Sequence, residues 1–255
     1  MRLSVVVPTF QRPASLVHCL HGLACQARAL DEILVVVRAG DAATHAVLRA
    51  ASPPVRSVEV ATPGLLAAMR AGAQAAAGDV IAFTDDDAVA RPDWAQRLED
   101  HFADPVVGAV GGRDLIAAET HGETGDVGRI TGWGKLVGNQ HLAVGSVRSV
   151  DVLKGVNMAF RRSALALPDH LRGRGSQVHS EIPMCAWTRS HGWRVVFDPE
   201  LVIDHAPAPR TAGDERARRA EDIRDSSFNL VSGSSPRTPS SRCAAPRMDC
   251  SLATA

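Results

Sequence analysis

Short runs of β-branched residues alternate with helical patterns through the first 113 residues of this 255-residue chain. Apolar runs of the right length for buried strands cover residues 3–7, 33–37, 55–60, 80–84 and 106–110. Between these runs, apolar residues recur at helical spacing, as Leu16, Leu20 and Leu23 do. This alternation predicts βαβ units, and therefore a single doubly wound α/β domain with a mostly parallel central sheet and helices on both faces.

The fourth apolar run ends in three consecutive acids, Asp85, Asp86 and Asp87. In an open α/β sheet, ligands bind beyond the carboxyl ends of the strands, so these side chains are expected at a functional edge. Adjacent carboxylates repel one another unless a cation lies among them, and oxygen ligands suit Mg²⁺ or Mn²⁺. A solvated acidic turn is the alternative explanation. If the run stays extended, Asp85 and Asp87 point to one side and Asp86 to the other.

Composition narrows the class of protein. Lys+Arg and Asp+Glu both number 28, so no basic field indicates a nucleic-acid partner. The five cysteines are odd in number and lack metal-type spacing, which favours free thiols in a reducing compartment. The apolar core of the N-terminus is too short for a signal peptide, and no stretch approaches the ~20 apolar residues of a membrane span. We therefore expect a cytoplasmic protein, with peripheral association at the inner face of the cell membrane left open.

The second half of the chain is less regular. Residues 114–149 are Gly-rich and weakly periodic, which predicts irregular structure on the active-site side, where specificity loops usually lie. A strand-like segment returns at residues 150–162, and short strands are expected at 193–197 and 201–203. Residues 214–225 predict a densely charged helix with a solvated face. Ser, Pro, Arg and Thr then dominate, so residues 230–255 are expected to be a disordered tail.

Several motifs, taken together, resemble the family 2 glycosyltransferases of the GT-A fold, which move a sugar from a nucleotide-diphosphate donor to an acceptor. The motifs are Val5–Arg12, Gly78–Asp87, Lys154–Arg162, the helix that begins near Glu181, and Asp204-His205. Each is weak alone, but their order and spacing match the family. The resemblance implies one GT-A domain over residues 1–229, with a nucleotide-binding half (1–113), a smaller acceptor-binding half (114–210) and the charged helix (211–229). The Ser/Pro/Arg-rich end is unlike the helical C-terminus expected from the family, which fits a truncated or altered reading frame.

The resemblance implies a metal-dependent, inverting transferase of the hexosyltransferase type that uses Mg²⁺ or Mn²⁺. Asp87 is expected to bind the metal ion, together with Asp85 and His205. The acceptor, which is a carbohydrate, a lipid-linked molecule or a small molecule, is expected to meet Asn157, Lys154 and Trp133. Glu181 matches the position of the catalytic base, and His179 either orients it or acts as the base instead. The donor is expected to contact Pro8, Thr9, Gln11, Arg12, Arg38, Asp41, Asp85 and Asp86.

Most of these residues also have an ordinary structural explanation. Arg12 and Asp86 can cap helices, and Asp86 can support a metal ligand without binding the ion itself. Arg38 and Asp41 fit a solvated turn, and Glu181 suits any helix N-terminus. His205 can also be an ordinary structural histidine. Trp133 and Trp187 can be ordinary core tryptophans.

Other functions fit the sequence less well. Nucleotidyltransferases of similar fold have a Gly-rich loop after the first strand, where this chain has Pro8-Thr9-Phe10-Gln11-Arg12. Aspartyl phosphatases and receiver domains need acids there. Many relatives end the second strand in a pair of acids, where this chain has Val37-Arg38 with Asp41 three residues later, and many have Asn in place of Arg70. The identity of the nucleotide base of the donor therefore stays open. The remaining alternative is a non-catalytic relative that binds nucleotide sugars, which would have no need of a base such as Glu181.

Overall fold

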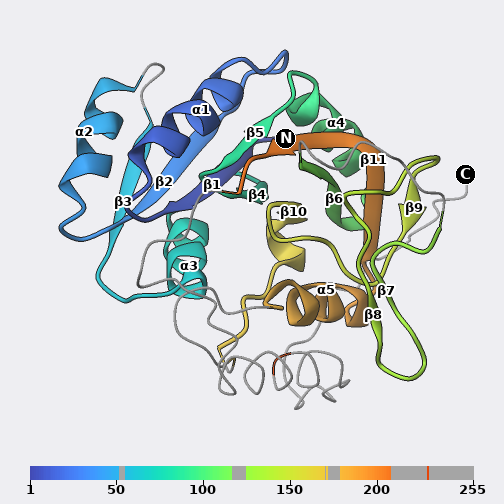
Figure 1. Cartoon of the computed structure of the whole chain (residues 1–255). Coiled ribbons are helices and arrows are strands. Elements are labelled where there is room, and N and C mark those ends of the chain that lie inside the picture. Colours follow the sequence, from blue (N-terminus) through green and yellow to red (C-terminus); the bar gives the residue numbers. More distant parts are fainter. Residues whose placement is uncertain (52–54, 117–124, 170, 172–178, 208–228, 230–255) are drawn as a thin grey trace, which may run out of the picture.

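A nine-stranded sheet forms the centre of the computed structural model, which describes residues 1–51, 55–116, 125–169, 171, 179–207 and 229 (Figure 1). From edge to edge its strands are β3 (Arg56–Val60), β2 (Glu32–Arg38), β1 (Leu3–Thr9), β4 (Val80–Thr84), β10 (Asn157–Arg161), β6 (Val107–Ile116), β11 (Arg194–His205) and β5 (Ala88–Ala90), with β9 (Arg148–Ser149) paired to β11. A separate small sheet pairs β7 (Arg129–Ile130) with β8 (Leu136–Val137). Only β5, β9 and β10 run against the common direction of the large sheet, so the predicted mostly parallel sheet is confirmed.

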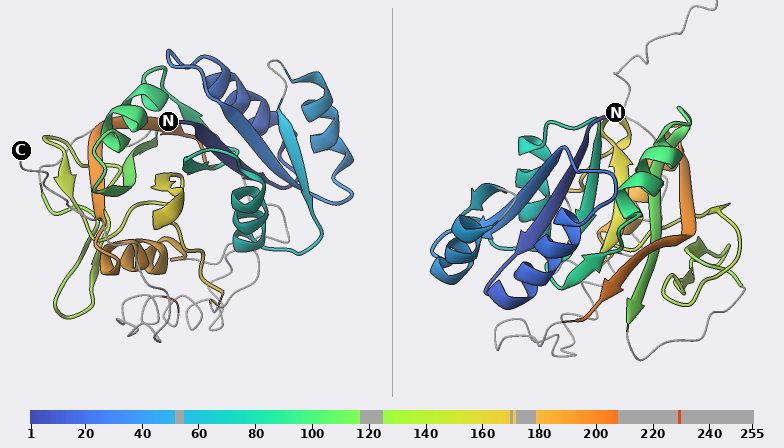
Figure 2. Two further views of the ribbon diagram at one scale, coloured as in Figure 1. Left: turned by 180° about the vertical axis from the view of Figure 1, so that it is seen from behind. Right: turned by 90° about the horizontal axis from the view of Figure 1, so that it is seen from above.

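Helices cover both faces of the sheet. They are α1 (Pro13–Ala24), α2 (Ala42–Ala50), α3 (Leu65–Ala75), α4 (Trp94–Phe102) and α5 (Glu181–Ser190), with a short 3₁₀ helix, η1 (Arg162–Ala164). Buried residues of α1 and α4 belong to one core cluster, which includes Val5 and Val7 of β1. Those of α3 and α5 belong to the other, which includes Val6. Figures 1 and 2 show the two pairs of helices on opposite sides of the strands, as a doubly wound fold requires.

The chain reverses its winding direction beside β1. From β1 it passes through α1 to β2 and β3 on one side, and it returns through α3 to β4 on the other side of β1. Helices α1 and α2, which connect β1 to β2 and β2 to β3, pack in one core cluster, and α3 packs in the other. The carboxyl ends of β1 and β4 therefore flank a topological switch point, which is where open α/β sheets bind their ligands.

The sequence prediction was wrong about several strands of the second half. The expected fifth strand stops at residue 110, whereas β6 continues to Ile116, because Gly111 and Gly112 are strand residues and not a turn. A Cβ on Gly112 would lie 1.8 Å from the carbonyl oxygen of Leu201, so only glycine allows β6 and β11 to approach this closely. The two short strands expected near residues 193–203 form one strand, β11, with a register shift between Asp198 and Val202. Strands β5, β7, β8 and β9 were not predicted.

Two predicted segments lie outside the described residues: most of the charged helix at 211–229 and the tail at 230–255. In the part of the chain that the structure describes, every helix falls short of the length and hydropathy needed to cross a bilayer. The described cysteines, Cys19, Cys25 and Cys185, are free thiols.

A buried acid joins β11 to α4 at a distance from the predicted site. The side chain of Asp198 is 3% exposed, His101 Nε2 lies 2.8 Å from Asp198 Oδ2, and the Glu200 amide donates to Oδ1 at 2.9 Å. Burial opposes ionisation of Asp198, but the bond to His101 and the Glu200 amide hold its pKa below the usual value. The carboxylate therefore contributes stability that is present above about pH 3.9, the unfolded-state pKa, and is lost as the pH falls through the lower folded-state pKa.

We expect Asp198→Asn to lower the free energy of unfolding by about 1.5–3 kcal/mol at neutral pH, the usual range for a hydrogen bond to a charged group. Below about pH 4 the variant should lose stability less steeply than the wild type. Urea unfolding between pH 7 and pH 2 measures both effects. Asp100→Asn, which alters an exposed acid bonded to Gln96, is the control and should change little. Parallel pH profiles for Asp198→Asn and wild type would contradict this account.

Candidate functional site

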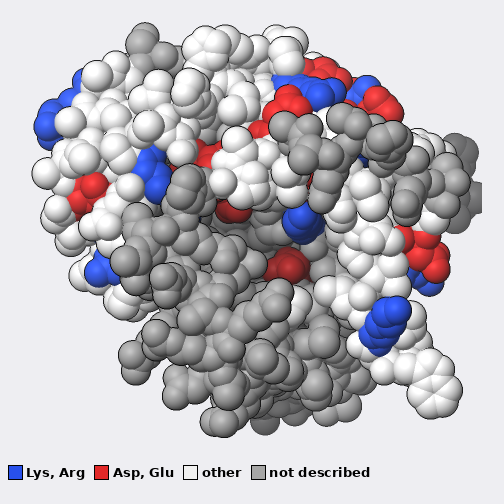
Figure 3. All heavy atoms as spheres, in the orientation of Figure 1, with Lys and Arg blue, Asp and Glu red and all other residues white. Residues whose placement is uncertain are grey.

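The three acids after β4 form a turn and separate into two groups. One oxygen each of Asp85 and Asp87 and one ring nitrogen of His205 lie within 4.8 Å of one another. Asp86 faces away and accepts a hydrogen bond from Thr9 Oγ1 at 2.7 Å. The predicted division of the acids is therefore what the structure has, although Asp86 and Asp87 are turn residues and not extended. Figure 3 shows a hollow in this face of the molecule whose walls carry acidic and basic side chains.

Strand pairing brings His205 to the acids. His205 is the last residue of β11, and it lies opposite Ala88, the first residue of β5. Because Ala88 directly follows Asp87, this register places the imidazole beside the carboxylate, with His205 Nε2 3.3 Å from Asp87 Oδ1. The Ala206 amide donates to the Asp87 carbonyl at 3.0 Å and holds the two segments together. Strand β5 was not predicted from the sequence, yet it sets this contact.

Asp86 joins the ends of β1 and β4. Besides Thr9, it meets Arg12, whose Nη1 lies 3.3 Å from Asp86 Oδ1 and 3.5 Å from Asp87 Oδ2. Arg12 also occupies the N-cap position of α1, but its side chain makes no capping bond there. Asp86 is thus bonded to Thr9 and Arg12 and lies outside the candidate metal group, which favours a supporting role over direct ligation.

The electrostatics of the acids suit the binding of a cation. Burial, and after it the charge of Asp87, raise the pKa of Asp85 to about 6. Burial alone would lower the pKa of His205, but Asp114 and Asp87 beside it raise that pKa to about 9. A divalent ion among these groups would favour both the carboxylate and the neutral imidazole, which are the forms that ligate metals.

The donor set of Asp85, Asp87 and His205 is suitable for a divalent metal ion. Carboxylate oxygens suit Mg²⁺ and Mn²⁺, whereas imidazole nitrogen suits the transition metals. The combination therefore fits Mn²⁺ better than Mg²⁺. Three protein ligands also leave coordination positions for water or substrate oxygens, since a divalent ion of this kind usually takes six.

Sequence reasoning missed Asp114, which extends this group. Asp114 lies in β6 with no exposed surface, its Oδ2 is 3.6 Å from His205 Nδ1, and it forms an ion pair with Lys154 Nζ. Burial opposes ionisation of Asp114, but His205 and Lys154 lower its pKa. Its signal in the sequence is an acid four residues beyond the apolar run at 106–110, which becomes visible once the strand is extended past Gly111. Lys154, expected at the acceptor, lies beside Asp114 next to the metal group, and its acceptor role stays a prediction.

The residues expected to bind the nucleotide follow β1 and β2. The guanidinium of Arg38, at the end of β2, lies 5.5 Å from the centre of the exposed Phe10 ring, and its buried Nε has no hydrogen-bond partner within the described structure. Asp41 caps α2 by accepting from the Thr44 amide, and it also accepts from the Gln11 amide at 2.7 Å. Asp41 thus has structural bonds that hold the loop after β1.

Pro8 lies within β1, opposite Val36 of β2, next to the Thr9 that bonds Asp86. The predicted donor residues after β1 and β2 are therefore gathered at one edge of the sheet, the edge that also holds Asp85 and Asp86.

Glu181 begins α5, and His179 precedes it in a left-handed conformation with φ 68°. Cys185, one turn further along α5, packs in the core, and its Sγ lies 3.5 Å from the Leu153 amide. Because residues four apart share a helix face, Glu181 lies on the face of α5 that meets the segment leading to Lys154. Glu181 thus shares a helix face with Cys185, whose thiol contacts the residue before Lys154, and its role as the base stays a prediction.

Two residues expected at the acceptor differ sharply in exposure. Asn157 has no exposed surface: it accepts from Trp94 Nε1 and donates to the carbonyls of Arg113 and Leu201, each at 2.9 Å. We therefore assign Asn157 a structural role in place of the acceptor contact, because its amide is committed to backbone carbonyls inside β6 and β11. Trp133 lies in the turn between β7 and β8 and is 99% exposed. The alternative that Trp133 is a core residue is therefore excluded. Trp187 stacks on His191.

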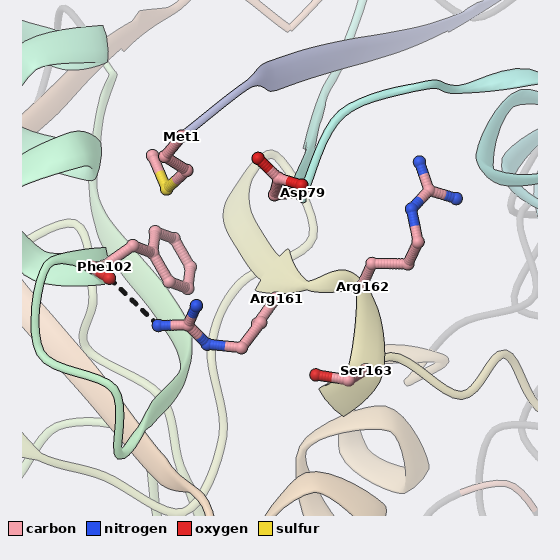
Figure 4. A pocket seen from close by; sticks show the side chains of 6 residues that line it. All are labelled: Met1, Asp79, Phe102, Arg161, Arg162 and Ser163. Atoms are coloured by element: carbon pink, nitrogen blue, oxygen red, sulfur yellow. Dashed lines mark hydrogen bonds between the residues drawn. The ribbon is translucent and has the colours of Figure 1, made fainter.

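A second concavity lies beyond the amino ends of the parallel strands, where β1 and β4 begin (Figure 4). It is an open concavity of about 540 Å³, lined by Met1, Asp79, Phe102, Arg161, Arg162 and Ser163. Arg161 donates to the carbonyls of Phe102 and Val107, and Arg162 donates to the Gly78 carbonyl. Both guanidinium groups are thus occupied by backbone carbonyls, and this pocket shares no residue with the site beyond the carboxyl ends of the strands.

Solved structures that resemble this one include three with bound nucleotide sugars. A mannosyltransferase from Pyrobaculum calidifontis in complex with GDP-mannose and Mn²⁺ has a TM-score of 0.64 at 20% identity, over 91% of this chain and 64% of that one. Glucosyl-3-phosphoglycerate synthase from Mycobacterium tuberculosis, with Mn²⁺, UDP-glucose and phosphoglyceric acid, has a TM-score of 0.61 at 16% identity, over 91% and 79% of the two chains. TarS from S. aureus with UDP-GlcNAc has a TM-score of 0.59 at 14% identity, over 83% and 60%.

These similarities confirm the GT-A fold that the motifs predicted. The chain spans less than two thirds of the length of the mannosyltransferase and of TarS. No curated protein matches the chain by sequence similarity. The family model described as glycosyltransferase-like family 2 matches residues 1–222, well over half of the 255 residues. The chain therefore belongs to glycosyltransferase-like family 2.

Proposed function

We propose that this protein is a metal-dependent, inverting glycosyltransferase that moves a sugar from a nucleotide-diphosphate sugar to an acceptor hydroxyl. The observation that carries the proposal is the group of Asp85, Asp87 and His205 at the topological switch point of a family 2 chain. The resembling structures hold GDP-mannose, UDP-glucose or UDP-GlcNAc, two of them with Mn²⁺, which supports the same class of donor here.

The metal ion, when bound, would act as a Lewis acid for the diphosphate that leaves the sugar. Asp85, Asp87 and His205 would hold that ion. Arg12 lies beside Asp87, and Lys154 lies beside Asp114, so both bring positive charge to the site, where it can stabilise a diphosphate as negative charge grows on it. The donor base would lie toward β2, where Phe10 and Arg38 stack and where Arg38 offers donors but no acceptor.

Inversion needs a base that removes the proton of the acceptor hydroxyl as the oxygen attacks the sugar. We assign this role to Glu181, because it begins α5 on the face directed to the segment before Lys154. His179, two residues earlier, is the alternative base or the residue that orients Glu181. The acceptor would approach from the side of α5 and the β7–β8 hairpin, where Trp133 exposes an aromatic ring to which a sugar can bind.

The test is a panel of GDP-, UDP- and dTDP-sugars, each with and without Mn²⁺, read by thermal shift and by release of nucleoside diphosphate. A donor that binds the native state raises the melting temperature by mass action. We expect one nucleotide to shift it strongly and only with the metal, and to be cleaved slowly by water or rapidly with an acceptor. A metal-dependent shift without any cleavage or transfer would favour a non-catalytic nucleotide-sugar-binding protein. No shift with any donor would contradict the proposal.

A further inference from the structure

Asp114 faces the side of His205 that the metal group leaves unused. We propose that Asp114 is a positioning residue that holds the His205 imidazole for the metal ion, an inference that rests on the proposed function of the site. His205 Nε2 lies 3.3 Å from Asp87, and Nδ1 on the other side of the ring lies 3.6 Å from Asp114 Oδ2. The imidazole is therefore placed between the two carboxylates, one in the metal group and one outside it.

The chemistry of a histidine ligand calls for such a partner. An imidazole that binds a metal through Nε2 carries its proton on Nδ1, and a carboxylate that accepts this proton fixes the tautomer and the ring orientation. His205 Nδ1 is buried and, within the described structure, has no hydrogen-bond partner that meets the usual geometry. A shift of about 0.5–0.8 Å brings Asp114 Oδ2 to hydrogen-bond length. Asp114 is therefore the acceptor that the buried ring nitrogen needs.

The backbone makes this arrangement rigid. Asp114 belongs to β6 and lies opposite Ile203 of β11, two residues before His205, so paired strands carry both groups. Strand β5 pairs with the other side of β11 and places His205 opposite Ala88. Sites built on strands hold their ligands more precisely than sites on loops, which favours metal binding without a large rearrangement.

Lys154 keeps Asp114 available as a charged acceptor. Its ammonium pairs with the same Asp114 oxygen that faces His205, and Asp114 has no exposed surface. A buried carboxylate without a cation partner would be costly, so the ion pair with Lys154 stabilises the charged form of Asp114. The network therefore continues from Asp87 through His205 and Asp114 to Lys154.

The test measures Mn²⁺ binding to the full chain without nucleotide, by the electron paramagnetic resonance signal of free Mn²⁺. Loss of a partner that supports a metal ligand typically weakens metal affinity 10–100-fold. We expect Asp114→Asn to weaken Mn²⁺ binding by that amount and Asp114→Glu, which keeps a carboxylate, to weaken it less. In a His205→Ala background, Asp114→Asn should weaken Mn²⁺ binding little further, because Asp114 acts through the imidazole.

Asp198 supplies a matched control, because it is another buried aspartate that faces a histidine, His101, outside the site. Asp198→Asn should lower the melting temperature without changing Mn²⁺ affinity. Unchanged Mn²⁺ affinity in Asp114→Asn, or an equal loss with and without His205, would overturn the inference. If Asp114→Asn does not fold, the same cycle with Asp114→Glu decides. A wild-type chain that binds no Mn²⁺, even with nucleoside diphosphate present, would overturn the proposed metal site itself.

Discussion

Asp87→Asn should abolish metal-dependent donor turnover, with a loss of roughly 10²–10³-fold, and should leave the fold intact. A metal ion that stabilises a leaving group contributes several kcal/mol to the transition state, and each 1.36 kcal/mol is a factor of ten. Asp87 belongs to the candidate metal group and lies 3.3 Å from His205, so its loss removes a charged ligand at the centre of the site. The charge of Asp87 also raises the pKa of Asp85, so the substitution relieves repulsion in the folded state.

The measurement compares donor cleavage at increasing Mn²⁺ in wild type, Asp87→Asn and Asp86→Asn, with melting temperatures recorded for each. Asp86→Asn is the matched control, since Asp86 is the neighbouring acid but bonds Thr9 and Arg12. We expect Asp86→Asn to retain Mn²⁺ dependence and to lose more stability than Asp87→Asn. Normal Mn²⁺-dependent turnover in Asp87→Asn would show that the metal site is elsewhere.

The first half of the fold and its acidic turn could be predicted because local patterns determine them. The run Val80–Thr84 is buried, and its parallel neighbours end at the same edge, so strand order alone gathers Thr9, Arg38 and Asp85 there. This inference needs only the periodicity of a strand and the rule for open α/β sheets. The separation of Asp86 from Asp85 and Asp87 was predicted for an extended chain, whereas in the structure it occurs in a turn in which Asp86 bonds Thr9 and Arg12.

The second half could not be predicted in the same way, because long-range pairing determines it. From the sequence alone, Gly112 is typical of a turn. Its reason is visible only in the fold, where a Cβ on Gly112 would lie 1.8 Å from the carbonyl oxygen of Leu201. Asn157 has the sequence signature of a binding residue, but its buried amide joins Trp94 to the backbone of two strands, β6 and β11. Asp114 is inconspicuous in the sequence because its partners, Lys154 and His205, are 40 and 91 residues away. Such contacts depend on register, which no local pattern specifies.

Glu181→Gln should lower the rate of sugar transfer by about 10²–10⁴-fold, the usual contribution of a general base, with donor affinity almost unchanged. Glutamine keeps the shape of the side chain and can still hydrogen-bond, but it cannot take the proton of the acceptor hydroxyl. Glu181 lies at the start of α5, whereas the metal group lies at the ends of β4 and β11. The substitution should therefore affect turnover, whereas Asp87→Asn should affect binding as well.

The two effects are separated by measuring donor binding calorimetrically and transfer under single-turnover conditions in the same preparations. Glu59→Gln, which changes an exposed acid on β3 at the edge of the sheet, is the control for the chemical change alone and should transfer normally. Near-normal transfer by Glu181→Gln would move the base to His179, and His179→Ala should then carry the loss. If both variants transfer normally, neither residue is the base. Because removal of a base slows transfer without preventing metal and donor from binding, only this pattern of intact binding and slow turnover supports the role of Glu181.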